Sequence, residues 1–182
     1  RISRIRFEHA DPETLGEVPN WLLSRYEDHY QNGEAELAVY STDPDLLAGI
    51  DPELIAKERT ARAKKFEPLR KYENVSNWCV VATASPAWAR KVFPRLSTED
   101  AQAKLWEAIF NSCRVDLPDP VQAWYDHRDN LIKYKNYLSA KHYSALHYKA
   151  PGTDLTIGLP EKHIWQGAEA SFKNGITCIV NI

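Results

Sequence analysis

The spacing of apolar residues predicts helices over the first third of the chain. Apolar side chains recur every three or four positions over residues 18–31, which is the period of one helix face, and Asn32-Gly33 marks the end of that helix. An aspartate followed by proline provides a cap and a favoured first helical residue. This signal predicts helix starts at Asp11-Pro12, Asp43-Pro44 and Asp51-Pro52, and the last of these helices should run to about Leu69.

Short apolar runs predict the strands between these helices. Residues 35–40 form one such run, and residues 78–84 form another, rich in β-branched side chains and typical of a buried parallel strand. Residues 2–7 alternate apolar and polar positions, which predicts a further strand. Ser85-Pro86 and the capping box at residues 97–100 then open two helices. The order strand, helices, strand, helices over residues 35–113 favours a parallel sheet covered by helices.

The pattern changes in the last quarter of the chain. Asp119-Pro120 opens a helix with apolar residues on one side, and from about Ser144 short strands and turns follow. Pro151-Gly152 suits a type II turn, because proline sets φ at its second position and glycine allows a positive φ at its third. Residues 176–182 read as another strand. We therefore predict an α/β fold class, with an α/β domain over residues 1–140 and the first strands of a β-rich domain over residues 141–182.

Composition narrows the class of protein. The chain has 182 residues, 43% of them hydrophobic and 26% charged, with a net charge of -2. A pI of about 6.3 provides no electrostatic footprint for nucleic acid or an anionic membrane, so neither partner is expected. No apolar run approaches the roughly 20 residues of a membrane-spanning helix. Three widely spaced cysteines predict reduced, buried thiols and a cytoplasmic protein. Because the chain lacks methionine and stops within an apolar run, we interpret it as an internal piece of a longer protein.

The histidines do not form a metal-binding motif. Metal ligands on a helix favour spacings of three or four residues, and no two of the six histidines have that spacing. They are interpreted as surface residues, or as residues that support a site without binding a metal themselves: His9, His29, His127, His142, His147 and His163. Asp126 and His127 are adjacent on a predicted helix, where neighbouring side chains do not face each other. Asp154 could serve a site, but aspartate also belongs in turns.

A nucleophile is not evident either. Ser85 follows the strand at residues 78–84, the position of the serine in α/β hydrolases, but it lacks the Gly-x-Ser-x-Gly pattern and is better read as a helix cap. Cys79 lies within the strand and is expected in the core. With seven glycines and no phosphate-loop motif, nucleotide binding is not indicated. Four tryptophans are expected to pack in the core, and Trp165 could line a cleft. These four are Trp78, Trp88, Trp106 and Trp124.

One segment has wording specific enough to indicate a family. Residues 146–165, LHYKAPGTDLTIGLPEKHIW, closely resemble the thermophilic-type metal-dependent aminopeptidases, the group that contains aminopeptidase T, aminopeptidase S and PepS. Further segments resemble the same family in the same order, so the resemblance extends over most of the chain. They are residues 77–94, 105–114, 119–124 and, more loosely, 41–49.

The resemblance implies a cytoplasmic, homodimeric exopeptidase that removes N-terminal residues from peptides with two divalent metal ions (Zn, Co or Mg). The resemblance also implies that the family's opening strand-helix unit would precede Arg1. Asn181-Ile182 match the beginning of the N-x-P-T-E-E segment that carries the family's first metal-binding glutamate, and the other ligands follow later. No catalytic, cofactor-binding or metal residue is therefore assigned to this chain, and we expect the 182-residue chain alone to be inactive.

Two other functions remain open at this point. The chain could be a non-catalytic scaffold that contributes a dimer surface and the wall of a substrate cavity. It could also be a serine or cysteine hydrolase using Ser85 or Cys79, although both the elbow motif and a placed base are missing.

Overall fold

The computed structural model describes residues 2–72 and 74–180. These residues form two compact units, one of residues up to Cys113 together with Phe172–Ile176, the other of Arg114–Ser171 with the residues from Thr177. Each unit is described by itself. The units divide after Cys113, whereas the predicted domain boundary lies near residues 139–142, and that boundary stays a prediction.

The first unit begins with a helix where a strand was predicted. Helix α1 spans Ile2–His9. The alternation of apolar and polar residues in this segment was misleading, because Arg4 and Glu8 lie one helical turn apart and form an ion pair at 2.7 Å. The Arg4 guanidinium also donates to the carbonyl oxygens of Leu46 and Ala48, both at 3.1 Å. These longer-range bonds stabilise α1 and were not visible in the local pattern.

Only one of the three Asp-Pro signals starts a helix. The Asp51 carboxylate accepts the Glu53 backbone N–H at 2.9 Å, and helix α3 follows over Pro52–Phe66. Asp11 and Asp43 accept equivalent bonds at 2.9 and 3.0 Å, yet only turns follow them, so those two helix predictions are wrong. The first turn ends at Gly16, and the second ends at Gly49 with a φ of +83°, a conformation that stops a helix.

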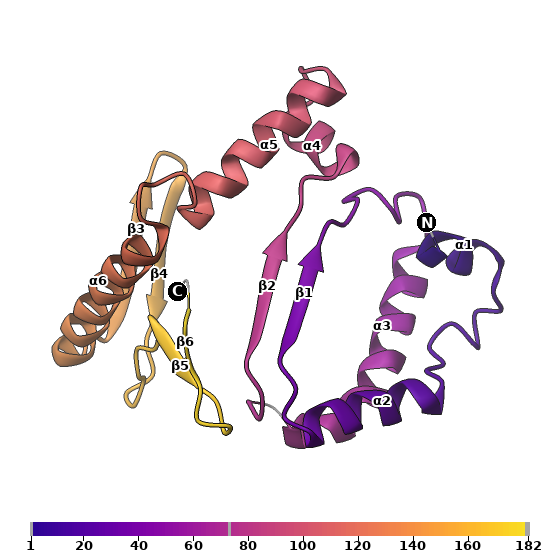
Figure 1. The fold of residues 1–182 in the computed structure, drawn as a ribbon, viewed down its shortest axis with the longest axis horizontal. Coiled ribbons are helices and arrows are strands. Elements are labelled where there is room, and N and C mark those ends of the chain that lie inside the picture. The colour runs from indigo at the N-terminus through magenta and orange to yellow at the C-terminus, as the bar shows by residue number, and fades with distance from the viewer. Residues whose placement is uncertain (1, 73, 181–182) are drawn as a thin grey trace. The chain divides into compact units, whose positions relative to one another are not determined.

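A parallel strand pair is the centre of the first unit. β1 (Glu36–Tyr40) pairs with β2 (Trp78–Ala82) in register from Glu36↔Trp78 to Tyr40↔Ala82. Helix α2 (Asn20–Gln31) precedes β1, and α3 with the 3₁₀ helix η1 (Glu67–Tyr72) connects the two strands, as Figure 1 shows. The predicted order and parallel direction are confirmed, and the fold class is α/β.

The predicted burial of the second strand is wrong. Trp78 is 56% exposed and Val80 is 55% exposed, and Cys79 is exposed rather than in the core. On the partner strand Leu37 is 64% exposed. The sequence has the composition of a strand covered on both faces, but the described residues do not cover it.

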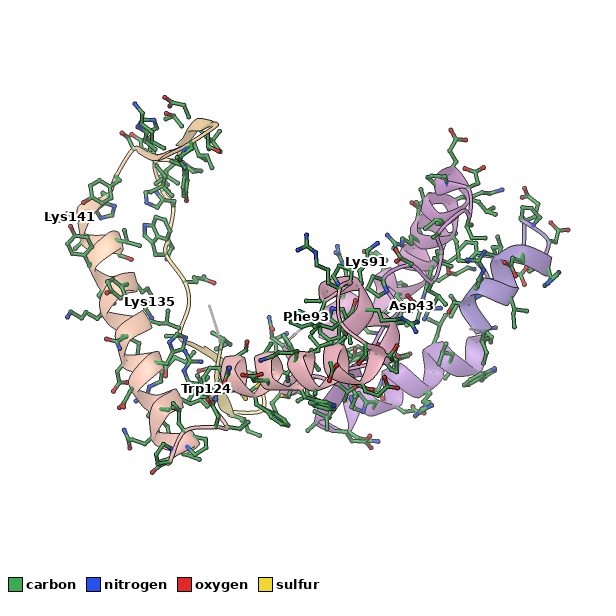
Figure 2. The ribbon with its side chains drawn as sticks, turned by 90° about the horizontal axis from the view of Figure 1, so that it is seen from above. Asp43, Lys91, Phe93, Trp124, Lys135 and Lys141 are labelled. Atoms are coloured by element: carbon green, nitrogen blue, oxygen red, sulfur yellow. The ribbon has the colours of Figure 1, made fainter. Side chains whose placement is uncertain are left out.

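The buried core of the first unit lies between two helices after β2. Helix α4 spans Pro86–Val92 and helix α5 spans Thr98–Cys113. Small and aliphatic side chains form the centre, and larger ones, including Phe93 in Figure 2, pack around it. The buried residues are Ala84, Ala89, Ala101 and Leu105, and those packed against them are Trp88, Phe93, Trp106 and Ile109. Ala108 and Cys113, on the same helix, are exposed, so the prediction of a buried thiol is wrong for Cys113.

Of the capping box predicted for α5, the bond to the Ser97 side chain is confirmed. The Asp100 backbone N–H donates to Ser97 Oγ at 3.1 Å, and the Ser97 hydroxyl donates to the Asp100 carboxylate at 2.8 Å. The side-chain amide of Gln102 then donates to the Ala84 carbonyl oxygen at 2.7 Å. This last bond connects α5 to the residues that follow β2.

The second unit begins with the long helix α6, Pro120–Lys141, which carries Trp124, Lys135 and Lys141 (Figure 2). The Asp119 carboxylate accepts the Gln122 backbone N–H at 2.9 Å, so the predicted cap is confirmed. His142 ends the helix with a φ of +47°. No residue of α6 is buried within the described part of the chain.

Two antiparallel strand pairs complete the second unit. β3 (Ala145–Ala150) and β4 (Thr153–Gly158) form a hairpin, and Gly152 takes a φ of +78° in the turn, as predicted. β5 (Glu169–Ser171) pairs with β6 (Thr177–Ile179). The predicted strand at residues 176–182 is therefore confirmed in its first half, whereas Asn181-Ile182 lie outside the described residues. Over the described chain, no helix combines the length and apolar character needed to cross a membrane.

Candidate functional site

The histidines are distributed over both units without forming a metal centre. Within residues 2–72 and 74–180, no group of three or more His, Cys, Asp or Glu side chains is arranged to hold a metal ion. His147 Nε2 and the Asp154 carboxylate lie 2.7 Å apart across the β3–β4 hairpin, and both side chains are exposed. Asp154 therefore has a local structural partner, as expected for an aspartate near a turn.

His163 and Trp165 form a second, smaller group in the second unit. His163 Nδ1 lies 2.7 Å from the Pro160 carbonyl oxygen, and its ring packs edge-on against Trp165. Its Nε2 atom and Trp165 Nε1 are buried and have no hydrogen-bond partner among the described residues. Neither side chain is fully buried, and Trp165 lines none of the cavities described below.

The candidate catalytic residues have structural roles. Ser85 Oγ accepts the Trp88 backbone N–H at 3.2 Å, so it caps α4, as the sequence indicated. Asp126 accepts a hydrogen bond from Gln122 at 2.8 Å, whereas the neighbouring His127 ring packs against Trp124. The structure therefore supports neither a serine nucleophile nor an Asp-His pair.

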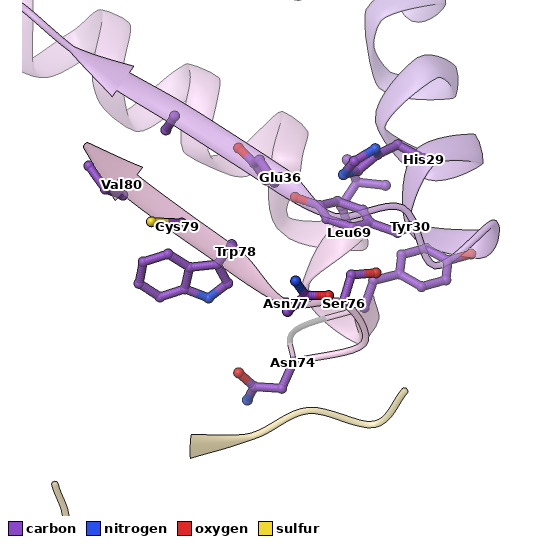
Figure 3. A pocket seen from close by; sticks show the side chains of 12 residues that line it. His29, Tyr30, Glu36, Leu69, Asn74, Ser76, Asn77, Trp78, Cys79 and Val80 are labelled. Atoms are coloured by element: carbon purple, nitrogen blue, oxygen red, sulfur yellow. The ribbon is translucent and has the colours of Figure 1, made fainter. Parts of the chain in front are cut away.

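A cavity in the first unit lies at the beginning of β1 and β2. Its volume is about 300 Å³, at the lower end for small-molecule sites. Figure 3 shows His29 and Tyr30 reaching from α2 toward Glu36 at the start of β1. Trp78, on β2, lies on the opposite wall. The remaining lining residues are Ala38, Leu69, Tyr72, Asn74, Ser76, Asn77, Cys79 and Val80.

His29 presents its Nε2 atom to this cavity. Its Nδ1 lies 3.0 Å from the Glu34 carboxylate, and this bond lowers the pKa of Glu34. A carboxylate only accepts, so Nδ1 carries the hydrogen of this bond, and in the tautomer with hydrogen on Nδ1 alone the Nε2 atom is an acceptor. That Nε2 atom is buried and has no partner among the described residues. This pair was not predicted, although His29 and Glu34 stand on either side of the helix-ending Asn32-Gly33 in the sequence.

A second unpartnered polar atom lines the same cavity. Ser76 is 8% exposed, and its Oγ has no hydrogen-bond partner in the described structure. Buried polar atoms are nearly always paired, so each exception calls for an explanation. Burial raises the pKa of the Tyr30 hydroxyl, and the negative charge of Glu36 raises it further. The cavity thus combines aromatic walls with a carboxylate and two unsatisfied polar atoms.

The loop that carries Ser76 is fixed from two sides. The backbone N–H of Glu36 donates to the Asn77 carbonyl oxygen at 3.1 Å. The backbone N–H groups of Lys173 and Asn174 donate to the carbonyl oxygens of Asn74 and Val75 at 2.7 and 3.1 Å. These backbone bonds connect Asn77 to β1 and Asn74 and Val75 to residues 173–174.

Comparison with known proteins identifies the family context. The family model described as "Thermophilic metalloprotease (M29)" matches residues 1–182. Aminopeptidase T of Thermus thermophilus is 41% identical over 183 residues, and aminopeptidase AmpS of Bacillus subtilis is 42% identical over 183 residues. Aminopeptidase PepS of Streptococcus thermophilus is 40% identical over 184 residues. Each alignment includes 100% of this chain.

A solved structure has the same fold. The wild-type AmpT from Thermus thermophilus matches with a TM-score of 0.84 and 40% identity, over 97% of this chain and 44% of that one. The chain spans about 45% of the length of the curated relatives it matches. The resemblance seen in residues 146–165 is therefore confirmed over the whole chain.

Proposed function

Because the chain belongs to the thermophilic metalloprotease (M29) family, we propose that it is part of a metal-dependent aminopeptidase that hydrolyses N-terminal residues from peptides. The observation that carries this proposal is the family match over residues 1–182, together with about 40% identity to named aminopeptidases. A metal-activated water is the usual nucleophile of such peptidases. The substrates, peptides with a free amino end, follow from the names of the relatives.

The metal centre of this proposal lies on residues beyond this chain. Within the described residues no group of carboxylate, histidine and cysteine side chains fits a divalent ion, and the relatives are more than twice as long. Two divalent ions (Zn, Co or Mg) would be held downstream, and no catalytic step is assigned to residues of this chain. The working form would be a cytoplasmic homodimer.

A paired activity assay tests the proposal. The 182-residue chain should not hydrolyse leucine p-nitroanilide with or without Co²⁺ or Zn²⁺, whereas the longer polypeptide should do so only with metal. Turnover by the pure 182-residue chain would contradict the placement of the metal centre. A metal-loaded longer polypeptide without aminopeptidase activity would contradict the function itself.

A scaffold or dimerisation role is the second candidate, and the exposed strand pair favours it. Leu37, Val39 and Val80 are each more than half exposed, and apolar surface of this kind often marks an interface. Sedimentation velocity of the 182-residue chain checks this role. A dimer that dissociates in Val39→Asp or Val80→Asp would support it, and a monomer at all concentrations would remove it.

A further inference from the structure

We propose that the cavity at the beginning of β1 and β2 binds a small organic cation, an ammonium group carried on an aromatic body. The proposal concerns the first unit alone and does not depend on the aminopeptidase activity. Three properties of the cavity point to this ligand: its hydrogen-bonding groups, its charge and its aromatic walls.

The polar atoms of the cavity require donors from a ligand. In the tautomer that carries its hydrogen on Nδ1 alone, His29 Nε2 is an acceptor. The Glu36 carboxylate is also an acceptor, and Ser76 Oγ can act as either. Two of these three groups have buried, unpartnered atoms, which costs free energy unless water or a ligand satisfies them. A ligand with several N–H donors satisfies this arrangement, and an ammonium group has three.

The charged residues that line the cavity favour a ligand with a positive charge. Glu36 supplies a negative charge, and no lysine or arginine lines the cavity within the described part of the chain. Lys71, on the adjacent η1, has its ammonium 4.8 Å from the Tyr72 ring centroid and is paired with Glu27 at 2.9 Å. A carboxylate or phosphate ligand would meet an acceptor-rich wall with no cation in its lining. A monocation is attracted by the Glu36 carboxylate.

The aromatic and aliphatic residues of the cavity walls favour a ligand with a compact aromatic ring. Tyr30 and Tyr72 stack with their ring centroids 5.8 Å apart and 22° between the planes, and Trp78 lies on the strand side. Leu69 and Val80 add aliphatic surface. A volume of about 300 Å³ suits one ring with a short side chain rather than an extended chain.

Phenethylammonium is the probe, and 3-phenylpropionate is its anionic counterpart of similar size. Amide and indole signals in ¹H–¹⁵N NMR spectra report binding, and Trp78→Phe assigns the Trp78 indole. We expect saturable shifts centred on Ser76, Asn77 and the Trp78 indole, with a Kd of about 1 mM. The anion should produce no shifts at equal concentration. Absent shifts would overturn the proposal, because water alone would then satisfy the cavity. Equal binding of cation and anion would also overturn it, because the site would then not distinguish the two charges.

Three variants make the test specific. Glu36→Gln should weaken binding of the cation about tenfold, because it removes the charge but keeps the shape. Glu161→Gln makes the same charge change outside the cavity lining and should leave the Kd unchanged. Ser76→Ala should weaken binding several-fold without lowering the melting temperature, since it removes a buried hydroxyl that has no partner. An unchanged Kd in Glu36→Gln would contradict the proposed position of the ammonium group.

The peptide Phe-Gly-Gly distinguishes two sources of the same chemistry. If the peptide shifts the same signals as phenethylammonium, the site accepts the amino end of a peptide. If only the free amine binds, the site takes a free aromatic amine. Either result supports an ammonium site, whereas shifts outside the cavity residues for both probes would overturn it.

Discussion

The α4–α5 helix pair and the β1–β2 strand pair are both apolar, but only the helix pair is buried by its neighbours in the chain. Leu105 in α5 is 4% exposed, whereas Val80 in β2 is 55% exposed. The helices follow one another directly in sequence and pack through a short connection. The strands come from residues about forty positions apart, and a parallel sheet is normally covered on both faces.

The two pairs differ in whether the contacts that stabilise them come from residues nearby in sequence or from distant ones. Each helix of the pair has its own cap, at Ser85 and Ser97, and its apolar face meets the other helix at once. The strand pair forms the backbone hydrogen bonds between β1 and β2 but leaves Leu37, Val39 and Val80 in contact with solvent. The strand pair therefore depends on surfaces other than those the described residues supply.

The largest expected effect comes from the buried side of this comparison. Leu105→Ala should lower the free energy of unfolding by about 3 kcal/mol, because it removes buried methyl groups and leaves a cavity. Urea denaturation followed by circular dichroism measures the loss. Val80→Ala is the matched control on the strand pair and should cost about 0.5 kcal/mol. Equal costs for the two variants would show that β2 is buried and would end the comparison.

A close contact between Gly16 and α3 provides the next largest effect. A Cβ atom at Gly16 would fall on the Ala61 side chain, well inside contact distance. Gly16→Ala should therefore destabilise the first unit by about 2 kcal/mol, measured as a lower urea midpoint. Adding Ala61→Gly should recover much of this loss although glycine disfavours the helix. A double variant no more stable than Gly16→Ala would contradict a direct clash.

Removing a helix cap should cost less stability. The caps of α4, which has a buried residue, and α6, which has none among the described residues, can be compared. Asp119→Ala should cost about 1 kcal/mol and reduce the helix content of α6, since the Gln122 N–H loses its acceptor. Ser85→Ala should cost a similar amount through α4. Asp119→Asn retains a cap and serves as the control, and far-ultraviolet circular dichroism follows all three. A fully helical Asp119→Ala variant would show that packing, rather than the cap, determines where α6 begins.

The smallest expected effect is a pH dependence of stability that arises from Glu27 and its partners Lys71 and Tyr72. Hydrogen bonds from Lys71 and Tyr72 lower the pKa of the exposed Glu27 carboxyl below its ordinary value of 4.5. A carboxyl with a lowered folded-state pKa adds stability that is present above its unfolded pKa and is lost as the pH falls through the folded value. Stability should therefore decline below about pH 4.5, and Glu27→Gln should flatten that decline.

Urea midpoints between pH 3 and pH 6 measure this pH dependence. Glu13→Gln, which removes an exposed carboxylate paired with Lys57, is the matched control and should leave the slope unchanged. An identical slope in Glu27→Gln would show that the network with Lys71 and Tyr72 does not contribute in solution.

Local signals predicted helices well where the following residues agreed with the start. Asp51, Asp119 and Ser85 each accept the predicted capping bond, and α3, α6 and α4 follow. Asp11 and Asp43 accept similar bonds, but their segments end in turns at Gly16 and Gly49. A cap supplies one or two hydrogen bonds, whereas a helix needs enough residues to repay its nucleation.

The candidate cavity was beyond the reach of sequence reasoning. Its wall combines α2, β1, η1 and β2, so residues distant in sequence meet only after folding. His29 was interpreted as a surface histidine, and no sequence motif indicates that its Nε2 atom is buried. The unpartnered hydroxyl of Ser76 gave no sequence signal, because a serine in a loop is ordinary.

The sequence by itself determined the family, the order of most elements and the parallel direction of β1 and β2. These properties depend on short-range residue spacing, turn residues and the exact sequences of motifs, all of which a single sequence contains. Only the tertiary structure decided that residues 2–7 are helical, that Trp78 and Cys79 are exposed, and that His29 and Ser76 share a cavity. Burial is the reason, because it depends on which distant segments cover a side chain, and local pattern does not encode that.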